Sequence, residues 1–185
     1  MMITLTGFMG SGKTTVGKVL ADFLGCPFMD LDDLVVKKAG KSIPDIFAQD
    51  GEPAFRQLEA QVLRKTVEKY AESTAVLALG GGAILAPASA ALLHEKTVCI
   101  YLRASLDTLL QRLSGETAGR PLLQEIPDQV GDDGGSVVMP GPDRASVSAR
   151  LASREPIYEE TAHVTIDTDG LSPDEVADEI IISAL

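Results

Sequence analysis

A glycine-rich segment close to the start of the chain constrains its fold more than any other feature. Residues 7–14 read Gly-Phe-Met-Gly-Ser-Gly-Lys-Thr and match G-x-x-x-x-G-K-[ST], the pattern of a phosphate-binding P-loop. Residues 2–6 before it are apolar or β-branched, which predicts a buried strand, and residues 14–24 after it carry apolar side chains at helical spacing. A P-loop between a strand and a helix predicts binding of a nucleoside triphosphate with Mg²⁺.

The residue types of this loop follow from the chemistry of phosphate binding. Glycines let the backbone turn tightly and direct N–H groups at phosphate oxygens, and the start of the following helix adds partial positive charge. The Lys13 ammonium can reach the β- and γ-phosphates, and the Thr14 hydroxyl can ligate Mg²⁺. The nucleotide contacts expected here come from Gly10, Ser11, Gly12, Lys13, Thr14 and Thr15.

Composition excludes several classes of function. The chain has 185 residues, of which 45% are apolar, and this length suits one domain with a buried core. Its net charge of −11 argues against a nucleic-acid surface and against an anionic membrane as partner. No apolar run reaches the roughly 18 residues of a membrane span, and no basic and apolar leader precedes the P-loop. We expect a monomeric cytoplasmic protein whose partners are small molecules.

Cysteines and histidines give no sign of a metal site. Cys26 and Cys99 lack the spacing of metal ligands, and we expect both to be small buried residues without a disulfide. His94 and His163 have no neighbours in the sequence that suggest a metal site or a catalytic triad. We expect both histidines to be structural or exposed.

Strands and helices alternate from one end of the chain to the other. Apolar segments predict strands at residues 2–6, 27–30, 75–79, 97–102 and 164–166, each followed by a helical pattern. This alternation predicts an α/β fold in three layers, with a five-stranded parallel sheet and helices on both faces. Ligands of such folds bind beyond the carboxyl ends of the strands. The site should therefore be built from residues 7–14, 30–33, 80–82, 103 and 167–170.

One long stretch breaks this alternation. Residues 114–142 show no clear periodicity and are rich in glycine, proline and aspartate. Irregular segments of this length are usually lids or disordered loops. We expect a lid loop within a single domain that spans residues 1–185.

Two acidic residues follow the expected second strand. Asp30 and Asp32 would lie beside the P-loop, where one carboxylate can serve a metal ion and another can orient and deprotonate a hydroxyl nucleophile. The alternative is that Asp32 or Asp33 only caps the helix that begins here, because acids are favoured in a first turn. Next to a P-loop we favour the catalytic interpretation for Asp32 and the capping interpretation for Asp33.

The third strand ends in Gly80, Gly81 and Gly82. A typical switch GTPase has an acidic metal ligand at this point and an Asn-Lys-x-Asp motif later, and the sequence contains neither. Three glycines leave backbone N–H groups open to close approach, which suits contact with a small polar substrate. The alternative is a flexible turn between a strand and a helix.

Three arginines are candidates for contacts with anions. Arg56 lies near the start of a long expected helix, Arg120 in the lid-like loop, and Arg154 in an Arg-Glu-Pro segment. Arginine suits bidentate binding of a carboxylate and stabilisation of a phosphoryl group in transfer. Each of the three taken alone could also form a surface ion pair.

Together these motifs resemble the shikimate kinase family over nearly the whole chain. The matching segments are residues 7–15, 29–32, 46–52 with 55–56, 79–82, 120–123 and 154–158. The P-loop is shared with many kinases, whereas the ordered set D-x-D, F-R, G-G-G, R-P-L-L and R-x-P-x-Y is much more specific. The resemblance implies a P-loop fold of the nucleoside monophosphate kinase type. It also implies transfer of the ATP γ-phosphoryl group to the 3-hydroxyl of shikimate.

The resemblance also implies roles for individual residues. Arg56 and Arg154 take the carboxylate of shikimate, and Asp32 meets its hydroxyls and acts as the base. Lys13 and Arg120 act on the phosphates during transfer, with Arg120 carried by the lid. The remaining implied contacts are Gly80, Gly81 and Gly82 for shikimate, Thr14 and, through water, Asp30 for Mg²⁺, and Arg112 for the adenine.

The chain departs from the family pattern at one place. The segment between Leu123 and Arg154 is about a dozen residues longer than expected, a kind of insertion that loops tolerate. We assign the surplus to residues 129–142, where Asp132 and Asp133 would repel ATP phosphates. We expect this acidic run to stay in solvent while Arg120 turns inward.

Two other functions remain open on the sequence. One is a kinase for another small sugar acid, such as gluconate, although the matches at Arg56 and Arg154 oppose it. The other is a nucleotide-binding regulatory protein without turnover, although intact Lys13, Asp32 and Arg120 argue against it.

Overall fold

A single parallel sheet forms the centre of the computed structural model, which describes residues 1–116 and 143–184. Its five strands lie in the order β2-β3-β1-β4-β5. All neighbouring strands run parallel, as the alternation of strands and helices predicts. The strands are β1 (Met2–Thr6), β2 (Phe28–Asp30), β3 (Ala75–Ala78), β4 (Val98–Arg103) and β5 (Val164–Asp167).

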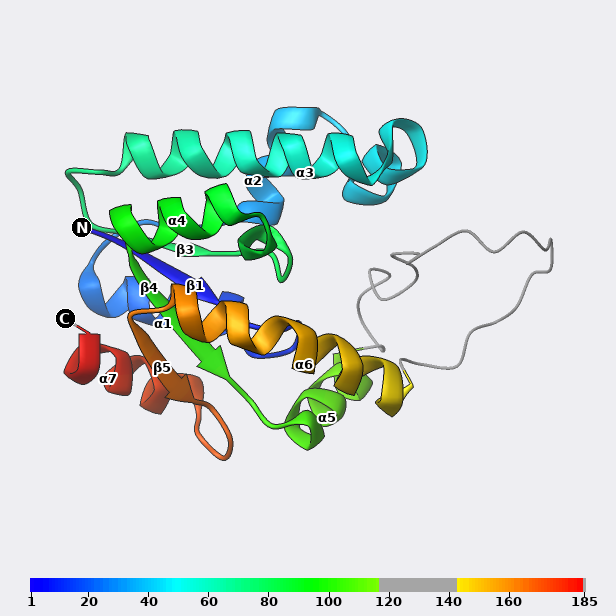
Figure 1. Ribbon diagram of the computed structural model, residues 1–185. Helices are drawn as coiled ribbons and strands as arrows, with labels where there is room; N and C mark the ends of the chain where they lie inside the picture. The colour runs from blue at the N-terminus through cyan, green and yellow to red at the C-terminus, as the bar shows by residue number, and fades with distance from the viewer. Residues whose placement is uncertain (117–142, 185) are drawn as a thin grey trace.

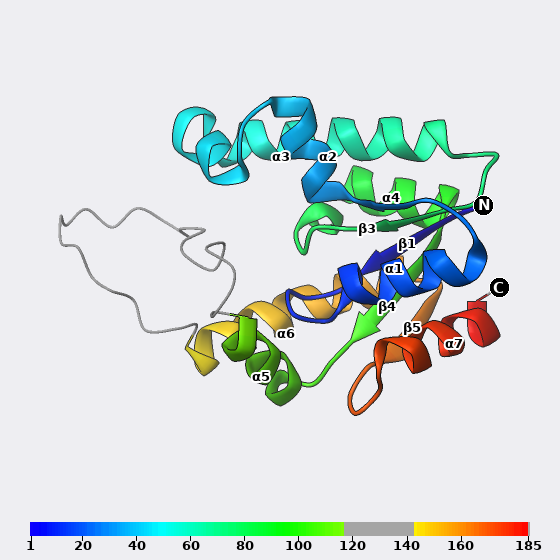
Figure 2. The same cartoon turned by 180° about the vertical axis from the view of Figure 1, so that it is seen from behind.

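Helices cover both faces of the sheet, so the expected three layers are confirmed (Figures 1 and 2). α1 and α7 pack on one face, while α3, α4 and α6 lie on the other. The central strand β1 is buried along its whole length because both of its faces are covered. The helices are α1 (Lys13–Leu24), α2 (Leu31–Ala39), α3 (Ile43–Lys69), α4 (Pro87–Lys96), α5 (Leu106–Glu116), α6 (Arg144–Thr161) and α7 (Pro173–Ala184), with a 3₁₀ turn η1 (Ala83–Leu85).

Capping side chains mark the starts of two helices. The Ser105 hydroxyl accepts from the Thr108 N–H at the start of α5, and Ser172 with Glu175 forms a reciprocal capping box at the start of α7. Gly51 has φ +80° and interrupts the helical geometry within α3. The side chains of Ser105, Ser172 and Glu175 thus accept from N–H groups at helix starts that would otherwise lack a partner.

Two expectations about local structure are wrong. α5 continues to Glu116, so the expected lid cannot begin at residue 114. The cap of α2 is neither Asp32 nor Asp33, because the Asp30 side chain accepts from the Asp32 N–H at 3.0 Å. Most of the expected lid, the insertion at 129–142 and Arg120 lie outside the described residues.

Within residues 1–116 and 143–184, no helix combines the length and apolar character that a membrane span requires.

Candidate active site

The P-loop leaves the carboxyl end of β1 and leads into α1, as the sequence predicts. Gly7, Gly10 and Gly12 have φ values of +144°, +79° and +92°, which side-chain-bearing residues rarely adopt. A Cβ atom at Gly7 would also lie 2.6 Å from the Leu102 carbonyl oxygen. The loop therefore requires glycine here for both its turn and its packing against β4.

The Lys13 ammonium lies across the P-loop. It donates to the Gly7 carbonyl at 2.9 Å and to the Phe8 carbonyl at 2.8 Å. Both acceptors belong to the loop that would surround the phosphates, so the charge of Lys13 is held at the phosphate position. Because Lys13 is only half-buried, its amine can also reach a bound anion.

Asp30 connects the P-loop helix to the end of β2. Its Oδ2 accepts from the Thr14 hydroxyl at 2.9 Å, while its Oδ1 caps α2. The bond to the main chain fixes the rotamer of Asp30 and leaves the other oxygen beside Thr14. A hydroxyl and a carboxylate oxygen are thereby side by side at the first turn of α1, and both are suitable ligands for a hard cation.

Asp32 lies in the first turn of α2, largely shielded from solvent. Burial raises the pKa of this carboxyl, and the neighbouring Asp30 raises it further, while Lys13 opposes both effects. A raised pKa makes the carboxylate a better proton acceptor than an ordinary aspartate. The environment of Asp32 therefore suits a base, whereas its exposed neighbour Asp33 has no such surroundings.

The glycine triplet contacts three different parts of the site. A Cβ atom at Gly80 would lie 2.8 Å from Asp32 Oδ1, and one at Gly82 would lie 2.6 Å from an Arg56 guanidinium nitrogen. At Gly81 the nearest atoms would be the Gly7 carbonyl oxygen and the Met9 nitrogen of the P-loop, both at 3.8 Å. The triplet is thus a close-packed junction between these groups, which argues against a merely flexible turn.

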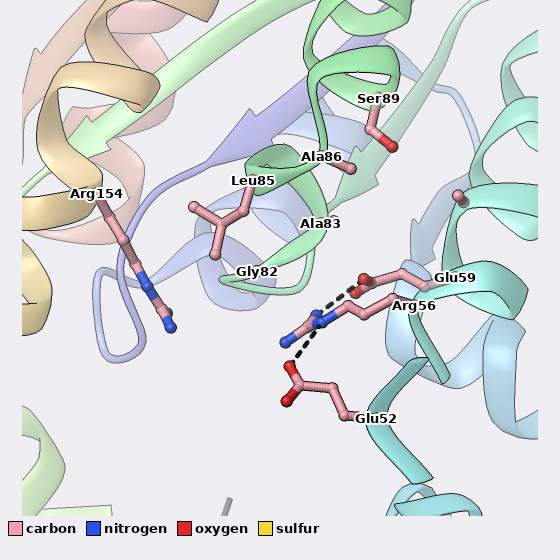
Figure 3. A pocket seen from close by; sticks show the side chains of 10 residues that line it. Glu52, Arg56, Glu59, Gly82, Ala83, Leu85, Ala86, Ser89 and Arg154 are labelled. Atoms are coloured by element: carbon pink, nitrogen blue, oxygen red, sulfur yellow. Dashed lines mark hydrogen bonds and ion pairs between the residues drawn. The ribbon is translucent and has the colours of Figure 1, made fainter. Parts of the chain in front are cut away.

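Arg56 and Arg154 extend from opposite walls of one cavity (Figure 3). Arg56 comes from α3 and Arg154 from α6, and the cavity of about 350 Å³ is in the range of small-molecule sites. The Arg154 guanidinium also lies 5.9 Å from the ring centre of Phe8 in the P-loop. The cavity therefore adjoins the phosphate site, although Asp32 and Lys13 do not line it themselves. Its lining is Glu52, Arg56, Glu59, Ala60, Gly82, Ala83, Leu85, Ala86, Ser89 and Arg154.

The two arginines differ in their partners. Arg56 donates to the buried Glu59 at 2.9 Å and to the exposed Glu52 at 3.2 Å. Among residues 1–116 and 143–184, Arg154 forms no ion pair with an acidic side chain. Arg154 is thus the cation in this cavity whose charge is least neutralised by the protein.

Glu59 was not identified from the sequence. It is buried beside Arg56 and Gly80, and burial raises the pKa of its carboxyl while the Arg56 guanidinium lowers it. A buried ion pair of this kind fixes the guanidinium in one position. The only signal in the sequence is the spacing of three between Arg56 and Glu59 on a helix, which surface pairs share.

Several other candidates lie away from the cavity. Arg103 forms an exposed ion pair with Asp167, so the ends of β4 and β5 do not contribute cations to it. The expectation that the two histidines are structural or exposed is confirmed: both are exposed, their rings stack with centres 4.7 Å apart, and each Nδ1 lies 3.1 Å from a main-chain atom. Cys26 and Cys99 are free thiols, although Cys26 is half-buried and not fully buried as expected.

Arg112 lies behind the P-loop. It donates to the Gly10 carbonyl at 3.4 Å, and to the hydroxyl and carbonyl of Thr168 at 3.2 and 3.0 Å. These contacts join α5, the P-loop and the segment after β5. Arg112 is therefore next to the nucleotide-binding loop, as the sequence interpretation requires.

Comparison with known proteins decides the family. A sequence model of the family described as shikimate kinase matches residues 9–184. The chain belongs to the shikimate kinase family. The shikimate kinase of Salinibacter ruber is 45% identical over 169 residues, which are 91% of this chain and 78% of the relative. That of Enterococcus faecalis is 39% identical over 180 residues, which are 97% of this chain and 95% of the relative.

A solved structure of the same family supports the assignment. The shikimate kinase from Acinetobacter baumannii in complex with shikimate matches with a TM-score of 0.79 and 34% identity. The match covers 97% of this chain and 90% of the other. Family membership confirms the enzyme class and the fold that the sequence motifs indicate. It also places the enzyme in the shikimate pathway of aromatic amino acid biosynthesis.

Proposed function

We propose that this chain transfers the γ-phosphoryl group of ATP to the 3-hydroxyl of shikimate, giving shikimate 3-phosphate and ADP. The observation that carries the proposal is the pair of arginines, Arg56 and Arg154, on opposite walls of a cavity next to the P-loop. A cavity with two guanidinium groups suits a small carboxylic acid, and the adjoining P-loop suits the phosphates of ATP. The bound shikimate in the related structure from Acinetobacter baumannii supports the same choice of acid.

The residues divide the reaction among them. Arg154 and Arg56 hold the substrate carboxylate, and the glycine triplet offers N–H groups to its polar atoms. Asp32 accepts the proton of the attacking substrate hydroxyl. The oxygen of that hydroxyl bonds to the γ-phosphorus, while the bond between the γ-phosphorus and the oxygen that bridges to the β-phosphate breaks. Lys13 neutralises the charge on the phosphates, and we assign Arg120 of the lid to the same task.

Mg²⁺ fits the residues at the first turn of α1. The described residues contain no cluster of three or more His, Cys, Asp or Glu that could hold a metal ion by itself. The Thr14 hydroxyl and the Asp30 carboxylate are oxygen donors 2.9 Å apart, which suits an ion that completes its shell with phosphates and water. When bound, Mg²⁺ would neutralise phosphate charge, with Thr14 as ligand and Asp30 acting through water.

The substrate test is release of ADP from MgATP with shikimate and with a panel of sugar acids that includes gluconate. We expect turnover with shikimate and little with gluconate, because the relatives that this chain matches at 39–45% identity are shikimate kinases. Turnover with gluconate in preference to shikimate would establish the second candidate substrate. ADP release that no acid stimulates would establish a nucleotide-binding protein without this transfer.

Arg154→Lys tests the carboxylate site. We expect the KM for shikimate to rise about 10- to 100-fold, because lysine cannot reproduce a bidentate, charge-assisted contact. The KM for ATP should stay close to that of the wild type. Arg144→Lys is a matched control, since Arg144 lies on the same helix and forms an exposed pair with Asp107. If Arg154→Lys weakens ATP binding and leaves shikimate binding intact, Arg154 belongs to the nucleotide site.

Gly82→Ala tests the position of Arg56. The new methyl group would lie 2.6 Å from a guanidinium nitrogen, while the φ of −108° at Gly82 is allowed for alanine. Because the Arg56 guanidinium is the far end of a flexible side chain, the guanidinium should be displaced while the backbone stays in place. We expect a rise of about tenfold or more in the KM for shikimate, with a melting temperature near that of the wild type. A variant with normal shikimate KM would show that Arg56 need not occupy this position.

We also propose that the enzyme is a cytoplasmic monomer. Its large exposed apolar side chains, Met1, Phe23, Val36 and Ile182, are scattered over different elements among the described residues. Scattered single residues do not make an association surface. Light scattering of the purified protein should give the mass of one chain, and the mass of two would reject the monomer.

A further inference from the structure

The carbonyl groups of the glycine triplet all accept hydrogen bonds within the protein. The Gly80 carbonyl accepts from the Ala83 N–H and the Gly82 carbonyl from the Leu85 N–H, both at 3.1 Å in the adjoining turn. The Gly81 carbonyl accepts from the Tyr158 hydroxyl at 2.7 Å, across 77 positions of the chain. Two of these bonds are local and form with the turn, whereas the third depends on a side chain of α6.

The N–H groups of the triplet are in the opposite situation. None of the three donates a hydrogen bond to an acceptor within residues 1–116 and 143–184. In a trans peptide the C=O and N–H groups point in opposite directions, so the bond that fixes the Gly81 carbonyl also fixes the Gly82 N–H. Gly82 lines the cavity between Arg56 and Arg154.

The two local bonds hold the Gly80 and Gly82 carbonyls and do not involve the peptide between Gly81 and Gly82. A peptide between two glycines turns over easily, because neither residue has a Cβ atom to restrict its φ and ψ. Tyr158 itself is 0% exposed, and its ring stacks on Tyr101 with the ring centres 5.2 Å apart. The donor is therefore rigid, and its hydrogen bond selects one orientation of a peptide for which the glycines allow more than one.

Tyr158 also lies one helical turn after Arg154 on α6. Burial raises the pKa of Tyr158 more than the charge of the Arg154 guanidinium and its contact with the hydroxyl lower it, so the hydroxyl stays protonated and remains a donor. One turn of α6 thus presents the cation of the cavity and the anchor of the glycine triplet together.

We propose that Tyr158 is a positioning residue for shikimate: its hydroxyl fixes the peptide between Gly81 and Gly82 so that the Gly82 N–H faces the substrate cavity. This role depends on shikimate being the substrate, as proposed above. The hydroxyl does not touch the reacting atoms. It acts by keeping one main-chain donor in the orientation that binding requires.

Tyr158→Phe removes the hydroxyl and keeps the ring and its stacking. We expect the KM for shikimate to rise about three- to tenfold, the cost of one hydrogen bond, while the KM for ATP stays near wild type. A merely structural role would lower the melting temperature without separating the two KM values. Unchanged shikimate KM, or an equal rise in both KM values, would overturn the proposal.

Tyr101→Phe is the matched control. Tyr101 is the other member of the stacked pair and is equally buried, but among the described residues the bond to the Gly81 carbonyl comes from Tyr158 and not from Tyr101. This variant should leave the shikimate KM unchanged. A rise equal to that of Tyr158→Phe would show that any change in the pair disturbs the site, and would also reject the specific role of Tyr158.

Two further measurements make every outcome decisive. If wild-type enzyme releases no ADP with shikimate, the proposed function fails, whereas an active wild type with a normal Tyr158→Phe variant rejects only the role of Tyr158. If Tyr158→Phe does not fold, ¹⁵N-glycine labelling of the wild type replaces it. The Gly82 amide resonance should then shift when shikimate is added, and an unmoved resonance at saturating shikimate would reject the proposal.

Discussion

Lys13→Ala is expected to fold and to lose at least about 10²-fold in kcat, the cost of removing one fixed donor from a developing charge. The ammonium donates to the Gly7 and Phe8 carbonyls, so its charge is already in place before the nucleotide arrives. It can therefore act on the phosphates both in the ground state and during transfer, without reorganisation. The measurement is kcat at saturating MgATP and shikimate.

The control for Lys13 lies on the same helix. Lys18 is exposed on α1, and Lys18→Ala removes the same charge from the chain without touching the P-loop. It should keep wild-type kcat, which separates a local effect from the change in net charge. Thermal melting of both variants checks that the P-loop has not unfolded. Wild-type turnover in folded Lys13→Ala would contradict the assignment of the nucleotide site.

The sequence predicts the sheet well because its signals are local. Each strand is a short apolar segment, and the P-loop pattern identifies the turn from β1 to α1 by itself. The capping groups of α5 and α7 also lie within four residues of the ends that they satisfy. Such features depend on neighbours in the chain, and pattern reasoning is sufficient for them.

The cap of α2 shows where local reasoning fails. Asp30, Asp32 and Asp33 are all acceptable cap residues by type, and composition cannot choose among them. The choice depends on Thr14, which holds the other oxygen of Asp30 from a different helix. The same contact that makes Asp30 the cap also keeps it beside Thr14, at the expected metal position. Only the capping role was therefore assigned to the wrong residue.

The sequence identifies the arginines of the cavity, but it does not identify the residues with which they pair. Arg56 and Arg154 were expected to share one ligand, and they do line one cavity, although only Arg56 has acidic partners among the described residues. Glu59 was missed because a glutamate on a long helix usually lies in solvent, and its buried carboxylate here lies against Gly80 and Arg56. Contacts between distant segments require the register of the fold, which no local pattern contains.

Asp32→Asn is expected to lower kcat by about 10²–10⁴-fold, the usual contribution of a general base. Asparagine has nearly the same size, so the close contact with Gly80 should survive and the KM for ATP should change little. The capping alternative predicts no loss, because Asp30 and not Asp32 caps α2. Asp33→Asn, at the exposed next position of the same helix turn, should keep wild-type kcat.

The pH profile gives a second test of Asp32. Burial raises the pKa of Asp32. As the pH is lowered, kcat of the wild type should therefore begin to fall at a higher pH than it would if the base were an aspartate with an ordinary pKa. The loss of kcat at low pH should not come from unfolding caused by protonation of Asp32. A carboxyl with a raised pKa in the folded state contributes stability at low pH that is lost as the pH rises through that pKa.

Glu59 must be separated from Asp32 in this experiment, since burial raises its pKa as well. Protonating Glu59 weakens its hold on Arg56, which should raise the KM for shikimate and leave kcat at saturation unchanged. The fall of kcat at low pH therefore reflects protonation of the base, Asp32. This fall should be absent from the pH profile of the residual activity of Asp32→Asn. If the variant keeps both this fall at low pH and the wild-type kcat, the base lies elsewhere in the site.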